Sequence, residues 1–95
     1  MTTLALPALL THDQAVNCLH SLGLGIRAEA GAKLAIDASA LEKFDSSALA
    51  VLLQCRRDSV ALGKNFEVNG LPHQLRELAN LYGISELLEA HSENA

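Results

Sequence analysis

Tryptophan is absent from this 95-residue chain, and aromatic residues make up only 3% of it. A folded core must therefore be built from Leu, Ala, Val and Ile. Hydrophobic residues reach 49% and charged residues 19%, a balance typical of a chain that buries a core rather than stays disordered. We expect one small domain over residues 1–95, with a frayed polar tail at residues 89–95.

Basic residues are also scarce, since seven Lys and Arg stand against eleven Asp and Glu, for a formal net charge of −4. Only Arg56 and Arg57 are adjacent, so the sequence lacks the basic patch of a nucleic-acid binder and of a protein that binds anionic membranes. No apolar run reaches the roughly 18–20 residues of a membrane-spanning helix. Met1–Leu10 lacks the basic start of a signal peptide. These features predict a cytoplasmic protein with no direct membrane insertion.

The chain has only two cysteines, Cys18 and Cys55, which lie far apart in helix-like stretches. Without a secretion signal, we expect reduced thiols that pack as small apolar groups, in preference to a disulfide. The four His residues share no short motif, and the six Gly residues are scattered. The sequence therefore predicts no metal site, no phosphate-binding loop and no cofactor. Nothing aligns a catalytic set of Ser, His and acid, and we expect no enzyme.

Strand-like and helix-like segments alternate along the chain. Strands are expected at Leu4–Leu10, Leu34–Asp37 and Phe66–Leu71. Pro7 has no amide for a ladder hydrogen bond, which indicates an edge or irregular strand. The order strand–helix, three times over, predicts an α/β fold with a parallel or mixed sheet. The second and third strands should be parallel neighbours, because a short helical crossover joins them.

Three helices are expected between and after these strands. The first begins at a capping box formed by Thr11 and Gln14, and its glycines leave open whether it ends near residue 23 or continues to Gly31. The second begins at Asp45-Ser46-Ser47 and ends before Gly63. The third has Pro72 at its first helical position and ends at Gly83. A last helical turn is expected at Ile84–Leu88.

The functional loops of open α/β sheets lie beyond the carboxyl ends of the strands, here Ala38–Ser47 and Gly70–His73. Within them, Asp45-Ser46-Ser47 is the most informative stretch. Asp45 or Ser46 could simply cap the following helix. Alternatively, a hydroxyl at this helix start could accept a phosphoryl group, whose charge the free amides would stabilise. The same exposed loop could also dock on a partner. Asp37, at a strand end, is interpreted as a solvated or capping acid.

The chain resembles STAS domains over nearly its whole length. The similar residues are Ile36–Ser39, Phe44–Leu53 and Phe66–Leu71, and the similarity continues into the last helix. The resemblance implies a small α/β fold with a mixed sheet and helices packed on it. Ala48 stands where the family usually has Gly, and the family's opening strand is missing or very short.

Within that family, Leu4–Leu6, the long second helix and the ending Leu78–Ile84 most resemble the small cytoplasmic, MlaB-like STAS subunit of bacterial Mla-type phospholipid ABC transporters, which maintain lipid asymmetry. This implies a non-catalytic subunit, held at the inner membrane by the ATPase subunit that it binds and supports. The alternative implied by the family is an anti-sigma factor antagonist that binds an anti-sigma kinase and is switched off by phosphorylation of Ser46. In either case the partner-binding loop is expected to be Phe44, Asp45, Ser46 and Ser47.

Overall fold

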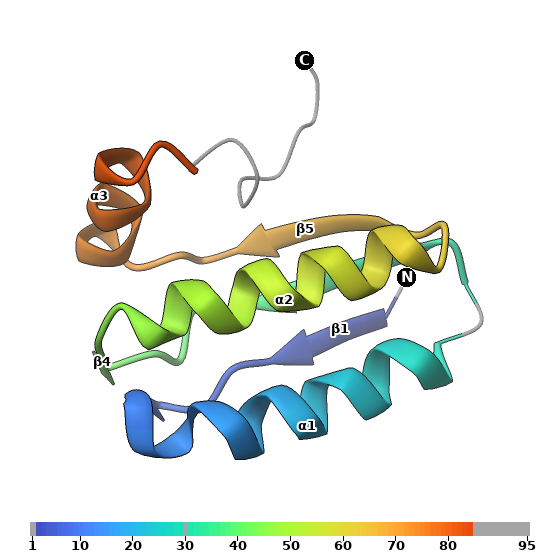
Figure 1. Cartoon of the computed structure of the whole chain (residues 1–95), viewed down its shortest axis with the longest axis horizontal. Helices are drawn as coiled ribbons and strands as arrows, with labels where there is room; N and C mark the ends of the chain where they lie inside the picture. Colours follow the sequence, from blue (N-terminus) through green and yellow to red (C-terminus); the bar gives the residue numbers. More distant parts are fainter. Residues whose placement is uncertain (1, 30, 85–95) are drawn as a thin grey trace.

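The computed structural model describes residues 2–29 and 31–84. Strands and helices alternate along it (Figure 1). The elements are β1 (Thr2–Ala5), β2 (Leu9–Leu10), α1 (His12–Ala28), β3 (Lys33–Asp37), β4 (Lys43–Phe44), α2 (Ser47–Ala61), β5 (Asn65–Asn69) and α3 (His73–Leu81).

The main sheet has the strand order β1-β3-β5, and β3 pairs in parallel with both neighbours. Helix α1 lies in the connection from β1 to β3, and α2 lies in the connection from β3 to β5. The α/β class and the parallel pairing of the second and third expected strands are therefore confirmed. A second sheet pairs β2 with β4, also in parallel. Within the described residues every strand pair is parallel. Of the two alternatives, a parallel or a mixed sheet, these residues therefore form the parallel one.

The expected strand Leu4–Leu10 is wrong as one continuous element. It is two strands, because β1 ends at Ala5 and β2 begins at Leu9. Pro7 lies in the break, where its missing amide costs no ladder hydrogen bond. The irregular edge strand that Pro7 indicated is thus confirmed, with β1 at the edge of one sheet and β2 in the other.

The helix ends agree with the sequence except at α3. Helix α1 passes through both glycines to Ala28. A Cβ on Gly25 would lie 3.0 Å from the side chain of Leu4, so this glycine permits close packing of α1 on β1. Gly63 and Gly83 have φ of 75° and 73° just beyond α2 and α3, as expected for residues that end helices. Pro72 is the N-cap of α3 and not its first helical residue, because its ψ of 146° is extended.

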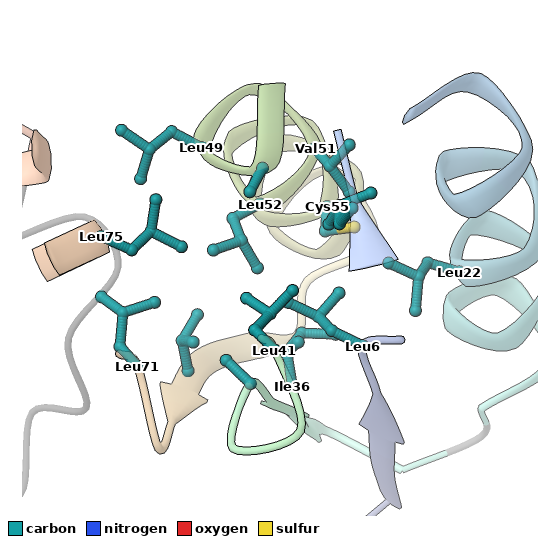
Figure 2. Packing of buried hydrophobic residues seen from close by; sticks show 14 of the residues in the cluster. Leu6, Leu22, Ile36, Leu41, Leu49, Val51, Leu52, Cys55, Leu71 and Leu75 are labelled. Carbon is teal, nitrogen blue, oxygen red and sulfur yellow. The ribbon is translucent and has the colours of Figure 1, made fainter. Parts of the chain in front are cut away.

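The core lies between the sheet and the helices (Figure 2). Leu52 projects from α2 toward the strands, Leu49 lies on the side of α3 and its Leu75, and Val51 and Cys55 lie on the side of α1 and its Leu22. Aliphatic side chains make up most of this core, as the absence of Trp required. The largest fully buried side chains are Leu6, Leu10, Ile26, Leu34, Ile36, Val51, Leu52, Cys55, Ser59 and Leu75.

Both cysteines are free thiols, as predicted. Cys55 is buried in the core, and Cys18 on α1 is half-buried against it. Burial raises the pKa of the Cys55 thiol to about 12, and the nearby Cys18 and Asp58 add to the rise. Burial also raises the pKa of Cys18. These thiols therefore stay protonated and pack as apolar groups.

In the described residues no helix is long and apolar enough to cross a membrane. The structure describes Ile84 but none of the residues after it. The rest of the expected turn Ile84–Leu88 and the tail at 89–95 therefore lie outside the described residues.

Candidate functional site

Two helices begin side by side at the edge where the parallel strands end (Figure 1). The small β2–β4 sheet brings them together, because Leu10 pairs with Phe44 and each strand leads almost directly into a helix. The carbonyl of Ala8 strengthens this pairing by accepting hydrogen bonds from the amides of Glu42 and Lys43, at 2.8 and 2.9 Å. The N-termini of α1 and α2 therefore lie close together.

The carboxylate of Asp45 joins these two helix N-termini. Its Oδ1 accepts a hydrogen bond from the amide of Ser47 in α2, at 2.8 Å. Its Oδ2 accepts one from the amide of His12 in α1, at 3.1 Å, although the two residues are 33 apart in sequence. The bond from Ser47 first, and then that from His12, lowers the pKa of Asp45 below its ordinary value. A carboxylate here also stabilises the positive ends of both helix dipoles.

Ser46 and Ser47 differ in their exposure to solvent. Ser46 is the exposed N-cap of α2, with helical φ and ψ of −63° and −14°, and its side chain makes no capping hydrogen bond. Ser47 is half-buried, and its amide is held by Asp45. Of the two capping residues that the sequence left open, Asp45 caps α2 and Ser46 leaves its hydroxyl available to a partner.

Phe44 differs from the other residues of the expected binding loop. It belongs to β4, is half-buried and packs against the hydrophobic core. Its ring therefore anchors the loop to the core, while Asp45 and Ser46 form the exposed surface.

A second group of residues lies at the ends of β3 and β5. Asp37 accepts a hydrogen bond from the amide of Ser39 at 2.9 Å, and its bonds with Ser39 lower its pKa. Gly70 has a φ of 71°, and a Cβ there would lie 2.8 Å from the Cβ of Ser39. Asp37 thus caps a turn, as the sequence indicated, and the two loops are closely packed. His73 is exposed on α3 and pairs with Glu77 at 3.3 Å.

The sequence reasoning missed the part that α1 plays at this site. The capping box of Thr11 and Gln14 is present, with the amide of Thr11 donating to Gln14 Oε1 at 3.0 Å. That box marks the start of α1 as Asp45 marks the start of α2. Because the strands are parallel, both helix starts lie at one edge of the sheet. The capping box was therefore a sequence signal that could have placed the start of α1 at this site. Among the described residues no group of three or more His, Cys, Asp and Glu is placed to hold a metal ion.

Comparison with known proteins places the chain in a family. A family model described as "Mlab, STAS domain" matches residues 2–89. The chain belongs to the STAS domain family. No curated protein sequence matches the chain.

Among solved structures, the STAS chain is similar to one titled "Structure of the Anti-Sigma Factor Antagonist SpoIIAA in its Unphosphorylated Form". The TM-score is 0.70 at 15% identity, and the match covers 98% of this chain and 79% of that one. At this identity the likeness shows the shared α/β fold. STAS domains are in general non-catalytic modules for protein interaction, which agrees with a site made of an exposed loop and a capping carboxylate.

Proposed function

We propose that this chain is the non-catalytic STAS subunit of an ABC transporter that moves phospholipids and maintains outer-membrane lipid asymmetry. In this role it binds the ATPase subunit on the cytoplasmic side of the inner membrane and supports its assembly and activity. The observation that carries the proposal is the match of the MlaB-type family model to residues 2–89.

The binding surface of this subunit is the loop Phe44–Ser47 with the first turn of α2. Several features suit this loop to docking. Ser46 is exposed and its side chain makes no capping bond. The carboxylate of Asp45 holds the loop in place by accepting hydrogen bonds from the amides of Ser47 and His12. Preorganisation of this kind lowers the entropy lost on binding.

A second function, antagonism of an anti-sigma kinase, is favoured by one observation. The exposed hydroxyl of Ser46 lies at a helix N-terminus, where the dipole stabilises an added phosphate. The likeness to an anti-sigma factor antagonist whose title specifies an unphosphorylated form agrees with this alternative. In that case phosphorylation of Ser46 would block the interface with the kinase.

Isolation of the protein from its host, under conditions that preserve complexes, distinguishes the two functions. For the transporter subunit we expect an ABC ATPase among the co-purified proteins, identified by mass spectrometry, and an intact mass that shows Ser46 mostly unmodified. A kinase without an ATPase, together with a substantial population heavier by one phosphate, would overturn the proposal in favour of the second function.

A further inference from the structure

We propose that Asp45 is a positioning residue that couples the start of α1 to the partner-binding loop. This inference rests on the proposed function, because it assigns to that loop a residue that controls its position. The hydrogen bond between the carboxylate of Asp45 and the amide of His12 carries it.

The geometry goes beyond what helix capping requires. A cap of α2 needs only the bond from the amide of Ser47 to Oδ1 of Asp45. The second oxygen accepts instead from another helix, at 3.1 Å. The same carboxylate therefore fixes the distance between the two helix starts, and Ser46 is the residue that follows it in the chain.

The start of α1 is itself well fixed, so it can serve as the reference for the loop. The amide of Thr11 and its hydroxyl both donate to Gln14 Oε1, at 3.0 and 2.6 Å. The preceding strand β2 pairs with β4, directly before Asp45. A change at the first turn of α1 should therefore reach Asp45 through one hydrogen bond and displace Ser46.

The substitution His12→Pro tests this coupling with little other disturbance. It removes the amide that donates to Oδ2 of Asp45. His12 is the first residue of α1, a position where proline is favoured. Thr11, which precedes it, has φ of −108° and ψ of −175°, the extended region that a residue before proline prefers. The matched control is His12→Ala, which removes the imidazole and keeps the amide.

The readout is the hydrogen-exchange rate of the Ser47 and Ala48 amides in the free protein, measured by NMR. We expect exchange about three- to tenfold faster in His12→Pro than in His12→Ala, the effect of losing one hydrogen bond. Equal exchange rates in the two variants would overturn the coupling, whatever the partner is. The affinity of both variants for the ATPase subunit is then compared. Faster exchange with unchanged affinity would uphold the coupling and remove the loop from the interface, which contradicts the proposed docking surface.

A second variant keeps the test decisive if His12→Pro fails to fold. Asp45→Asn keeps Oδ1 as an acceptor and replaces Oδ2 by an NH₂ group, which cannot accept from His12. It should speed exchange at Ser47 and Ala48 as His12→Pro does. Where both variants fold, the double variant should exchange no faster than Asp45→Asn alone, because the bond that His12→Pro removes is already missing there. Exchange in Asp45→Asn as slow as in the wild type would contradict the proposal. So would a double variant whose increase in exchange rate is the product of the two single increases.

Discussion

At the scale of single residues, Gly70 shows how a backbone conformation can join two loops. Its φ of 71° suits glycine, and its α-carbon faces Ser39 so closely that a Cβ would lie 3.1 Å from the backbone there. We expect Gly70→Ala to lower the free energy of unfolding by about 2–4 kcal/mol, from strain and overpacking together.

Gly63→Ala separates these two causes, because Gly63 has a φ of 75° but no atom within 4 Å of the added Cβ. Gly63→Ala should lower the free energy of unfolding by the backbone strain alone, about 1 kcal/mol. Urea denaturation of both variants measures the difference. Equal losses would show that contact with Ser39 contributes nothing.

Asp45 should make the stability of the protein depend on pH in the acid range. Its hydrogen bonds from Ser47 and His12 lower its pKa, so the unfolded chain binds the proton more readily than the folded one. The stabilisation is therefore complete above the ordinary Asp pKa of about 3.9 and is lost as the pH falls through the lower folded-state pKa.

The free energies of unfolding of wild type and Asp45→Asn should accordingly differ most above about pH 5 and converge toward pH 2. Denaturant titrations at a series of pH values measure this. Asp13→Asn, at an exposed acid in the first turn of α1, is the control. A difference between wild type and Asp45→Asn that stayed constant with pH would show that the carboxylate charge does not matter.

At the scale of elements, the opposite end of α1 is held by Lys64. Its ammonium donates to the carbonyls of Glu29 and Gly31, where α1 ends and the turn to β3 begins. A cation at a helix C-terminus also stabilises the dipole. Lys64→Met should lower the free energy of unfolding by about 1–3 kcal/mol, whereas Lys33→Met, on an exposed side chain of β3, should change it by less than about 0.5 kcal/mol. A thermal or urea melt that ranked the two variants equally would contradict this role.

The packing of α1 on α2 gives the two cysteines different reactivities. In denaturant without reductant, Ellman's reagent should find two thiols per chain. In the folded protein Cys55, which is fully buried, should react slower than Cys18 by roughly two orders of magnitude, since its pKa is raised and reaction needs local opening. Cys18→Ser should abolish the fast phase alone. Finding no thiols in the denatured chain would indicate a disulfide.

Elements with a strong local signal in the sequence could be predicted, and elements without one could not. The strand Leu34–Asp37 and the start of α1 were predictable, because an apolar run and a capping box specify them locally. The split between β1 and β2 was not, because apolar residues continue across Pro7. The β2–β4 pairing was not predictable either, because strands of two residues are too short to show a periodicity. The pairing also depends on the carbonyl of Ala8, which is distant in sequence from β4.

The candidate site was predictable in part. Asp-Ser-Ser before an aliphatic helix indicated a capped helix start, and Asp45 does cap α2. Its second bond, to His12, depends on the tertiary arrangement of two helices and leaves no mark in the local sequence.

At the scale of the whole molecule, the exposed starts of α1 and α2 lie at one edge of the fold, and Cys55 and the aliphatic side chains are buried between the sheet and the helices (Figures 1 and 2). A module of this design suits docking through one loop. The proposed function depends on that loop being the surface that meets the ATPase subunit.

Calorimetric titration of the purified ATPase subunit with this protein tests that claim most directly. Ser46→Glu should leave the fold intact, because an acid at a helix N-terminus is favourable, yet weaken binding about tenfold or more through charge and crowding at the interface. Ser21→Glu, the same change at an exposed position of α1, should stay within about twofold of wild type. Ser46→Ala and Ser47→Phe extend the series. Unchanged affinity in all three loop variants would contradict the account.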